Sequence, residues 1–290
     1  MSKRRKQAGG EAGAKRSKVR DVFVPRPFEG LAGEADWIAL RELVPAASSP
    51  VRLRPEYGDR EVTVATVLPM AWPALTKPDG RIFLGLQRHQ QSGDVSRDIA
   101  VALLNALEVT DLGGPVTVPP LPGEGPRLQD ILVDGALDVT VHTGFNFWLD
   151  NDPGDDPTVA ASLERANASV QPTTKLAAVP AAYWCRVPEK AHVRWVLTEA
   201  EEPALAALAR LGADGALPLG ENTKFAGMFR AHGRLVPVWD LPPDVQPEEW
   251  ETPLAEFAKR YAEAVASDAE LTAAERRTRQ GLLGRQLTLR

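Results

Sequence analysis

The chain has 290 residues, of which 43% are hydrophobic and 25% charged, with a net charge of −5, and this length can bury one large core or two smaller ones. Its longest apolar runs, such as Ile99 to Leu107, are well short of the roughly 20 residues that a membrane span needs. The single cysteine, Cys185, excludes an intrachain disulfide, and no apolar signal-peptide core follows the charged N-terminus. These features predict a soluble cytoplasmic protein without a membrane span.

The first 20 residues form a strongly basic tail on an acidic chain. They contain eight Lys or Arg and one Glu, a net charge of about +7, which leaves 26 of the 34 basic and 38 of the 39 acidic residues for the body. Low hydrophobicity and like charges predict a disordered tail, which would bind polyanions by counterion release or fold back on the body. The basic residues expected to contact a polyanion are Lys3, Arg4, Arg5, Lys6, Lys15, Arg16, Lys18 and Arg20.

The next part of the chain alternates helical and strand-like patterns. A helix is expected from Glu34 to Val44, and the turn Lys77-Pro78-Asp79-Gly80 predicts a hairpin. A second helix follows Asp94 or Ser96 as its cap, and two short runs flank a turn at Thr143-Gly144. The other expected elements are strands at Val51 to Arg54, Glu61 to Leu68 and Arg81 to Leu86, a loop from Gly113 to Pro126 and a short helix at Leu128 to Val133.

The second part of the chain shows a similar order of hairpins and helices. One hairpin is expected in "KLAAVPAAYWCRVPEKAHVRWVL" and another turns at His232-Gly233. Helices are expected at Pro157 to Ser169, at Thr198 to Leu211 behind a Thr198/Glu201 capping box, from the cap Thr252 to Val265, and behind a Thr272/Glu275 capping box.

Short matches between the two parts suggest an internal duplication. "LPMAW" at Leu68 to Trp72 resembles "VPAAY" at Val179 to Tyr183, and "HTGFNFWLD" resembles "AHGRLVPVWDL". We therefore predict an α+β protein made of two related hairpin-helix halves with C-terminal helices. The expected divisions are a disordered tail at 1–20, a first half at 21–150, a second half at 151–245 and C-terminal helices at 246–290.

The acidic run after the first half has two interpretations. In "HTGFNFWLDNDPGDDP" the aspartates precede an expected helix, where carboxylates cap free N–H groups and face the positive end of the helix dipole. A Ca²⁺ or Mg²⁺ site is the weaker interpretation, because Leu149 falls on the first ligand position of an EF-hand loop. Its weak candidate ligands are Asp150, Asp152, Asp155 and Asp156. We expect no metal and no cofactor.

No complete set of catalytic residues can be assembled from the sequence. The four histidines lack metal-ligand spacing, the run from Gly215 lacks the Lys of a phosphate-binding loop, and Cys185 is expected in the core. A polar connector into a helix is the best place for a ligand, although a capped turn explains it too. The candidate ligand residues are Arg88, His89, Gln91, Ser92, Asp94 and His142.

The segment "VRDVFVPRPFEGLAGEADWIALRELVPAA", which follows the basic start, resembles an actinobacterial family that is catalogued as a domain of unknown function. The likeness runs through most of the chain from Val19 and implies no activity, fold or site. The expected function is therefore a non-enzymatic binding or adaptor protein whose tail contacts RNA, the ribosome or DNA. The alternatives are an enzyme or small-ligand sensor that uses a cleft between the halves, and a partner of a protein complex that docks through the C-terminal helices, at Leu254 to Val265.

Overall fold

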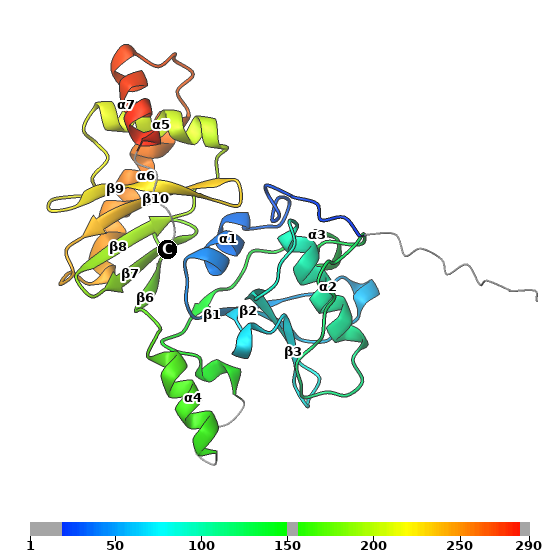
Figure 1. Cartoon of the computed structure of the whole chain (residues 1–290). Helices are drawn as coiled ribbons and strands as arrows, with labels where there is room; N and C mark the ends of the chain where they lie inside the picture. The colour runs from blue at the N-terminus through cyan, green and yellow to red at the C-terminus, as the bar shows by residue number, and fades with distance from the viewer. Residues whose placement is uncertain (1–18, 150–155, 285–290) are drawn as a thin grey trace, which may run out of the picture.

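A computed structural model describes residues 19–149 and 156–284 of the chain. Within these residues, seven α-helices and two five-stranded sheets form a mixed α+β fold, which confirms the predicted fold class. Figure 1 shows the two sheets side by side, with helix α1 (Glu34–Glu42) between them. No helix in the described ranges is long and apolar enough to cross a membrane.

The first sheet has the strand order β3-β4-β2-β1-β5. The turn predicted at Lys77 to Gly80 is present, since the Gly80 N–H donates to the Lys77 carbonyl at 2.9 Å. It joins β4 to the short strand β3, whereas β2 pairs with β4 in parallel across the sheet. The strands are β1 (Ala47–Val51), β2 (Val62–Val67), β3 (Ala74–Thr76), β4 (Ile82–Gln87) and β5 (Thr140–Val141).

Helices α1 and α2 (Val95–Glu108) bury apolar side chains against one face of this sheet, and α3 (Leu128–Ile131) packs beside α2. Of the two caps predicted for α2, Asp94 and Ser96, the N-cap is Asp94, whose Oδ1 accepts the Arg97 N–H at 3.2 Å. The Arg97 guanidinium in turn donates to backbone carbonyls of the predicted surface loop, at Pro122, Gly123, Glu124 and Pro126. One side chain therefore fixes a loop that has little regular structure.

The opposite face of the first sheet is covered by aromatic side chains. The indole N–H of Trp148 donates to the Val67 carbonyl at 3.0 Å, and the ring packs against Phe145. The second run predicted after Thr143-Gly144 is wrong as a strand, because the backbone there forms a 3-10 helix, η3 (Asn146–Trp148). The reason is local, since Asn167 of α4 (Pro157–Asn167) accepts the Phe145 N–H at 2.6 Å and takes the place of a strand partner.

The second sheet is antiparallel throughout, with the order β6-β7-β8-β10-β9. Both predicted hairpins are confirmed, and His232 and Gly233 turn the second one with φ values of 46° and 78°. Its elements are β6 (Thr173–Leu176), β7 (Ala182–Val187), β8 (Lys190–Trp195), α5 (Glu201–Ala213), β9 (Lys224–Ala231), β10 (Arg234–Leu241), α6 (Glu251–Val265) and α7 (Ala273–Leu283).

Helices α5, α6 and α7 lie on the outer side of the second sheet (Figure 1). Helix α6 buries Leu254, Phe257 and Tyr261 in the core of its own half. The apolar stripe that was expected to dock a protein partner is therefore used inside the fold.

Of the caps predicted at Thr198, Thr252 and Thr272, the one at Thr272 is confirmed. Thr272 caps α7, because its Oγ1 accepts the Glu275 N–H at 3.3 Å. The Glu275 carboxylate in turn accepts the Thr272 N–H at 2.6 Å, which completes the capping box. The Thr198/Glu201 capping box is wrong, since α5 begins at Glu201 and that carboxylate binds Arg230 at 2.8 Å. Thr252 is no cap either, because a 3-10 helix, η5 (Pro247–Trp250), leads straight into α6.

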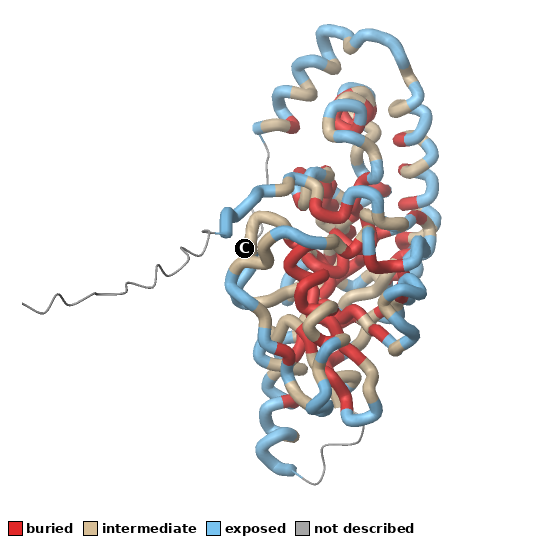
Figure 2. The backbone as a smooth tube through the Cα atoms, turned by 90° about the vertical axis from the view of Figure 1, so that its right-hand side faces the viewer, coloured by how far each residue is buried: buried red, intermediate tan, exposed pale blue. Residues whose placement is uncertain are grey.

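Helix α1 joins the two halves by packing against both sheets. Its residues share one apolar cluster with the second sheet, which contributes Tyr183, Val236 and Val238. Figure 2 shows the buried backbone concentrated through the middle of the molecule. The space where a cleft between the halves was expected is thus occupied by α1.

The internal duplication is not confirmed. The two sheets differ in strand order, and the first contains a parallel pair that the second lacks. What does recur is local, since the matched prolines of "LPMAW" and "VPAAY" are each followed by a residue with φ of 54°, Met70 and Ala181. Each of these turns precedes a hairpin and a helix.

Candidate functional site

The two ends of the polar connector from Arg88 to Asp94 make contacts inside the protein, whereas residues 89–91 are exposed. The Arg88 guanidinium forms an ion pair with Asp98, and these side chains are only 6% and 1% exposed. The Ser92 N–H donates to the other carboxylate oxygen of Asp98 at 2.7 Å. Arg88 and Ser92, which the sequence offered as ligand residues, therefore neutralise and fix a buried carboxylate within the protein.

Two more of the candidate residues also bind neighbouring side chains. Asp94 caps α2 and forms an ion pair with the Arg127 Nε at 3.0 Å. The Gln91 side-chain carbonyl accepts a hydrogen bond from the buried Arg41, whose pKa is lowered by its removal from water. His89 is exposed, as is Gln91, but within the described residues it has no side-chain hydrogen bond of the kind that ties Gln91 to Arg41. The connector thus fastens α1 and α2 together, while its middle residues, 89–91, are exposed.

An extended N-terminal segment, residues 21–24, crosses the connector at Gly93. The Gly93 N–H donates to the Asp21 carboxylate at 2.7 Å, and the Val24 N–H donates to the Gly93 carbonyl at 2.8 Å. A Cβ atom at Gly93 would lie 2.6 Å from the Val22 carbonyl oxygen, so the close approach requires glycine. The basic tail therefore departs from a fixed point on the body.

Of the residues expected to contact a polyanion, Arg20 lies in the described part of the chain and is exposed. Lys3, Arg4, Arg5, Lys6, Lys15, Arg16 and Lys18 lie outside the described residues.

His142 lies at a different place from the connector, beside β5. Its Nε2 is 2.8 Å from the Ser48 Oγ, and its ring stacks on Phe147 with centroids 4.3 Å apart. Burial lowers the pKa of His142, so the imidazole is neutral at neutral pH and can accept the hydroxyl proton. Ser48 lies in β1 between two paired strands, opposite Ala65 of β2 and Thr140 of β5, so its backbone is part of the sheet.

Ion pairs surround α1 at the junction of the halves. Glu34 accepts from Arg26 at 2.8 Å and from Arg234 at 2.7 Å, while Glu42 lies 2.8 Å from the His232 Nε2. Burial alone would raise the pKa of both glutamates, but these hydrogen bonds and positive charges outweigh it and lower each pKa. Both carboxylates are therefore ionised, and their ion pairs with Arg234 and His232 connect α1 to the second sheet.

Sequence reasoning missed a row of three side chains across the second sheet. Cys185 of β7 is directly opposite His192 of β8, which is opposite Asp240 of β10, and the His192 Nδ1 lies 3.1 Å from an Asp240 oxygen. Correct pairing of both hairpins would have revealed the row. Burial raises the pKa of the Cys185 thiol and lowers that of His192, so the proton stays on sulfur and the thiol is not an activated nucleophile.

Of the four candidate metal ligands in the acidic run, the described residues include Asp156. Asp156 is the N-cap of α4, where its Oδ1 accepts the Thr158 N–H at 2.8 Å, as the capping interpretation predicts. Asp150, Asp152 and Asp155 lie outside the described residues. In the described ranges, no group of three or more His, Cys, Asp or Glu is arranged to hold a metal ion.

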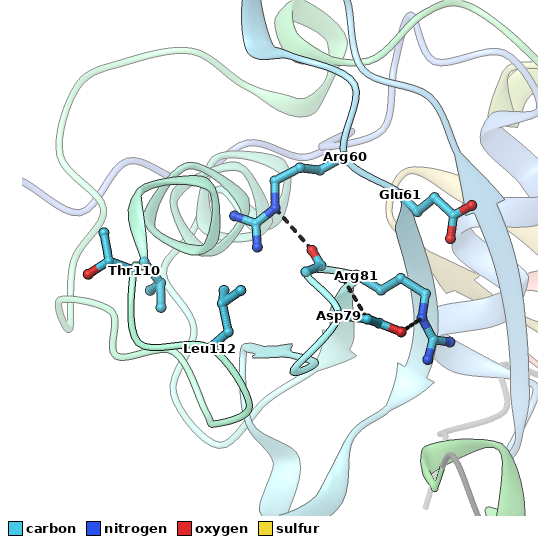
Figure 3. Close-up of a pocket in the computed structure, with 8 residues that line it drawn as sticks. Arg60, Glu61, Asp79, Arg81, Thr110 and Leu112 are labelled. Atoms are coloured by element: carbon cyan, nitrogen blue, oxygen red, sulfur yellow. Dashed lines mark hydrogen bonds and ion pairs between the residues drawn. The ribbon is translucent and has the colours of Figure 1, made fainter.

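Two shallow cavities adjoin Arg60 and Glu61 at one end of the first sheet. Figure 3 shows the smaller one, of about 520 Å³, in which Arg60 donates to the Gly80 carbonyl at 3.0 Å and Arg81 pairs with Asp79 at 2.7 Å. The neighbouring cavity, of about 840 Å³, runs along residues 50–63. Since cations and carboxylates alternate around both, neither has the surplus charge that would select an ionic ligand.

One comparison with known proteins gives a match. A family described as "Family of unknown function (DUF5926)" matches residues 27–290, which is nearly all of the chain. No curated protein and no solved structure matches it.

Proposed function

Because the chain belongs to this family of unknown function, its role has to be inferred from its own charges and contacts, and we propose that it is a non-enzymatic binding or adaptor protein of the cytoplasm. Its basic tail contacts an anionic partner, RNA, the ribosome or DNA. The observation that carries the proposal is the separation of charge, with about +7 on residues 1–20 and 26 basic against 38 acidic residues beyond them. Such a tail attracts polyanions, while the acidic body limits contact to the tail.

The contacts at Gly93 support this role. Asp21 and Val24 bind the backbone of Gly93 on both sides, so the tail is attached to a rigid surface immediately after its last basic residue. A tether of this kind lets the tail hold a polyanion while the folded body is presented to a second partner. Location in the cytoplasm is supported by the single, buried and reduced Cys185.

The internal use of the polar side chains favours binding over catalysis. Arg88, Ser92 and Asp94, candidates for a small-molecule site, are engaged in contacts that hold the first turn of α2. Burial raises the pKa of the Cys185 thiol, which disfavours the reactive thiolate, and Ser48 lies inside β1 between two paired strands. The proposed activity therefore rests on the tail.

The direct test measures RNA and DNA binding by the full-length protein and by a variant in which all eight basic tail residues are replaced by Gln. The control replaces four exposed basic residues of the body, Arg52, Lys224, Lys259 and Arg277, by Gln. We expect the tail variant to lose binding at low salt and the control to keep it. Equal binding by the tail variant and the wild type would refute the proposal.

A further inference from the structure

Phe23 is exposed to solvent at the point where the tail meets the body. Its side chain is 78% exposed, and its neighbours Val22 and Val19 are 62% and 50% exposed. An aromatic ring that is exposed to solvent does not gain the favourable free energy of burial. A binding partner that covers the ring would recover it.

The backbone that carries Phe23 is fixed on both sides. Asp21 accepts the Gly93 N–H at 2.7 Å, and Val24 donates to the Gly93 carbonyl at 2.8 Å. The Phe23 Cα lies close against Gly93, where a Cβ atom would be 2.7 Å from it. The ring therefore stands on a rigid backbone, and a ligand that packs on it pays little entropy for ordering the chain.

The chemistry of a ligand for this surface follows from the basic tail and from the exposed ring of Phe23. The basic residues end at Arg20, three positions before Phe23, which in extended backbone is about 10 Å. A polymer whose phosphates bind the tail would thus bring its next units to the ring. In a duplex the bases are stacked inside, whereas an unpaired base can lie flat on an aromatic side chain.

We propose that Phe23 is a stacking residue for an unpaired base, so that the anionic partner is single-stranded nucleic acid. This inference rests on the proposed function and narrows its partner. An anionic lipid surface would also accept the apolar side chains, but it would bring an extended negative plane against the acidic body. A flexible single strand contacts the tail and Phe23 alone.

The test uses the full-length protein with Phe23→Ala, Phe23→Leu and Phe23→Trp, a 20-nucleotide single-stranded RNA, and an RNA duplex of the same length. Stacking contributes about 1–3 kcal/mol per base, so we expect Ala and Leu to weaken single-strand binding by about 5- to 150-fold, while Trp retains it. Duplex binding should not change. The dependence of affinity on salt should be the same in all four proteins, because the tail is intact.

Other results would separate this inference from the proposed function. Salt-sensitive binding that is unchanged in Phe23→Ala overturns the stacking role and leaves the tail as the binding element. Full retention by Phe23→Leu shows a general apolar contact and also overturns it. If Phe23→Ala binds RNA as the wild type does but no longer binds vesicles of phosphatidylglycerol and phosphatidylcholine, the ring contacts lipid and the stacking role is overturned. Failure of the wild type to bind RNA or DNA at low salt refutes both proposals.

Discussion

At the scale of single residues, the most consequential contact is the ion pair of Asp98 with Arg88. Both side chains are almost fully buried, and the Ser92 N–H satisfies a further oxygen of the carboxylate. Removing one partner of a buried pair leaves the other charge without compensation in a medium of low dielectric constant. This contact explains why a polar connector, which looks like a ligand loop in the sequence, is a structural joint.

We predict that Asp98→Ala lowers the free energy of unfolding by about 3–5 kcal/mol, as expected for a buried charge that loses its partner. The double variant Arg88→Met, Asp98→Leu should be less destabilised than Asp98→Ala, because it removes both charges and keeps the volume. Asp79→Ala is the matched control, since Asp79 and Arg81 form an exposed pair. Urea denaturation gives these values, and equal destabilisation by Asp79→Ala and Asp98→Ala would contradict the assignment.

The sequence could predict which residues of the connector are polar but not which way they point. The cap of α2 was narrowed to Asp94 or Ser96 because the capping pattern is local, and the structure has Asp94. The partner of Arg88 is Asp98 inside α2, and the partner of Gln91 is Arg41 of α1, 50 positions away. Tertiary packing decides such contacts. A polar residue that is paired inside the fold therefore cannot be told from an exposed one by its sequence pattern.

At the scale of elements, the helix caps give a matched pair of predictions. Thr272 accepts the Glu275 N–H at the start of α7, whereas Thr252 lies inside a helix that begins one residue earlier. Loss of a capping hydroxyl costs about 1 kcal/mol, so Thr272→Ala should destabilise the protein by about that amount and Thr252→Ala by much less. Hydrogen exchange at the first turn of α7 reports the same change locally. A larger effect of Thr252→Ala would show that the caps are misassigned.

The junction helix α1 predicts a pH dependence. Because the pKa values of Glu34 and Glu42 are below their ordinary value of 4.5, both glutamates stabilise the folded state above about pH 4.5. That contribution is lost as the pH falls through their lower folded values. Acidification should therefore destabilise the wild type more than the Glu34→Gln, Glu42→Gln variant, as measured by urea unfolding at several pH values. Identical pH profiles would show that these ion pairs do not fasten the halves.

Helices with apolar periodicity and tight turns were the elements that the sequence predicted best. Helices α1, α2 and α6 follow from apolar periodicity, and the turn at His232-Gly233 follows from its residue types. The 3-10 helix η3 was missed, because an Asn167 side chain from α4 replaces the strand partner that its β-like residues suggest. Residue patterns record local preference, and this contact is not local.

At the scale of the whole molecule, the arrangement of the halves could not be predicted from the sequence. The periodicity of Trp37, Leu40 and Val44 indicates one buried face on α1, whereas the helix packs against both sheets and buries nearly every residue. The parallel pairing of β2 with β4 likewise depends on a crossover that no short motif encodes. The division of charge between tail and body is a property of the sequence itself, and contact of the tail with a polyanion stays a prediction.

The measurement that tests the central claim most directly is the salt dependence of binding to single-stranded RNA by the full-length protein. Each phosphate contact on a single strand contributes about −0.7 to the slope of log K against log salt concentration, so eight contacts predict a slope of about −5 to −6. The variant with eight Gln in the tail should show a slope near zero and little affinity. A wild-type slope near zero, or the same slope in both proteins, would contradict the account.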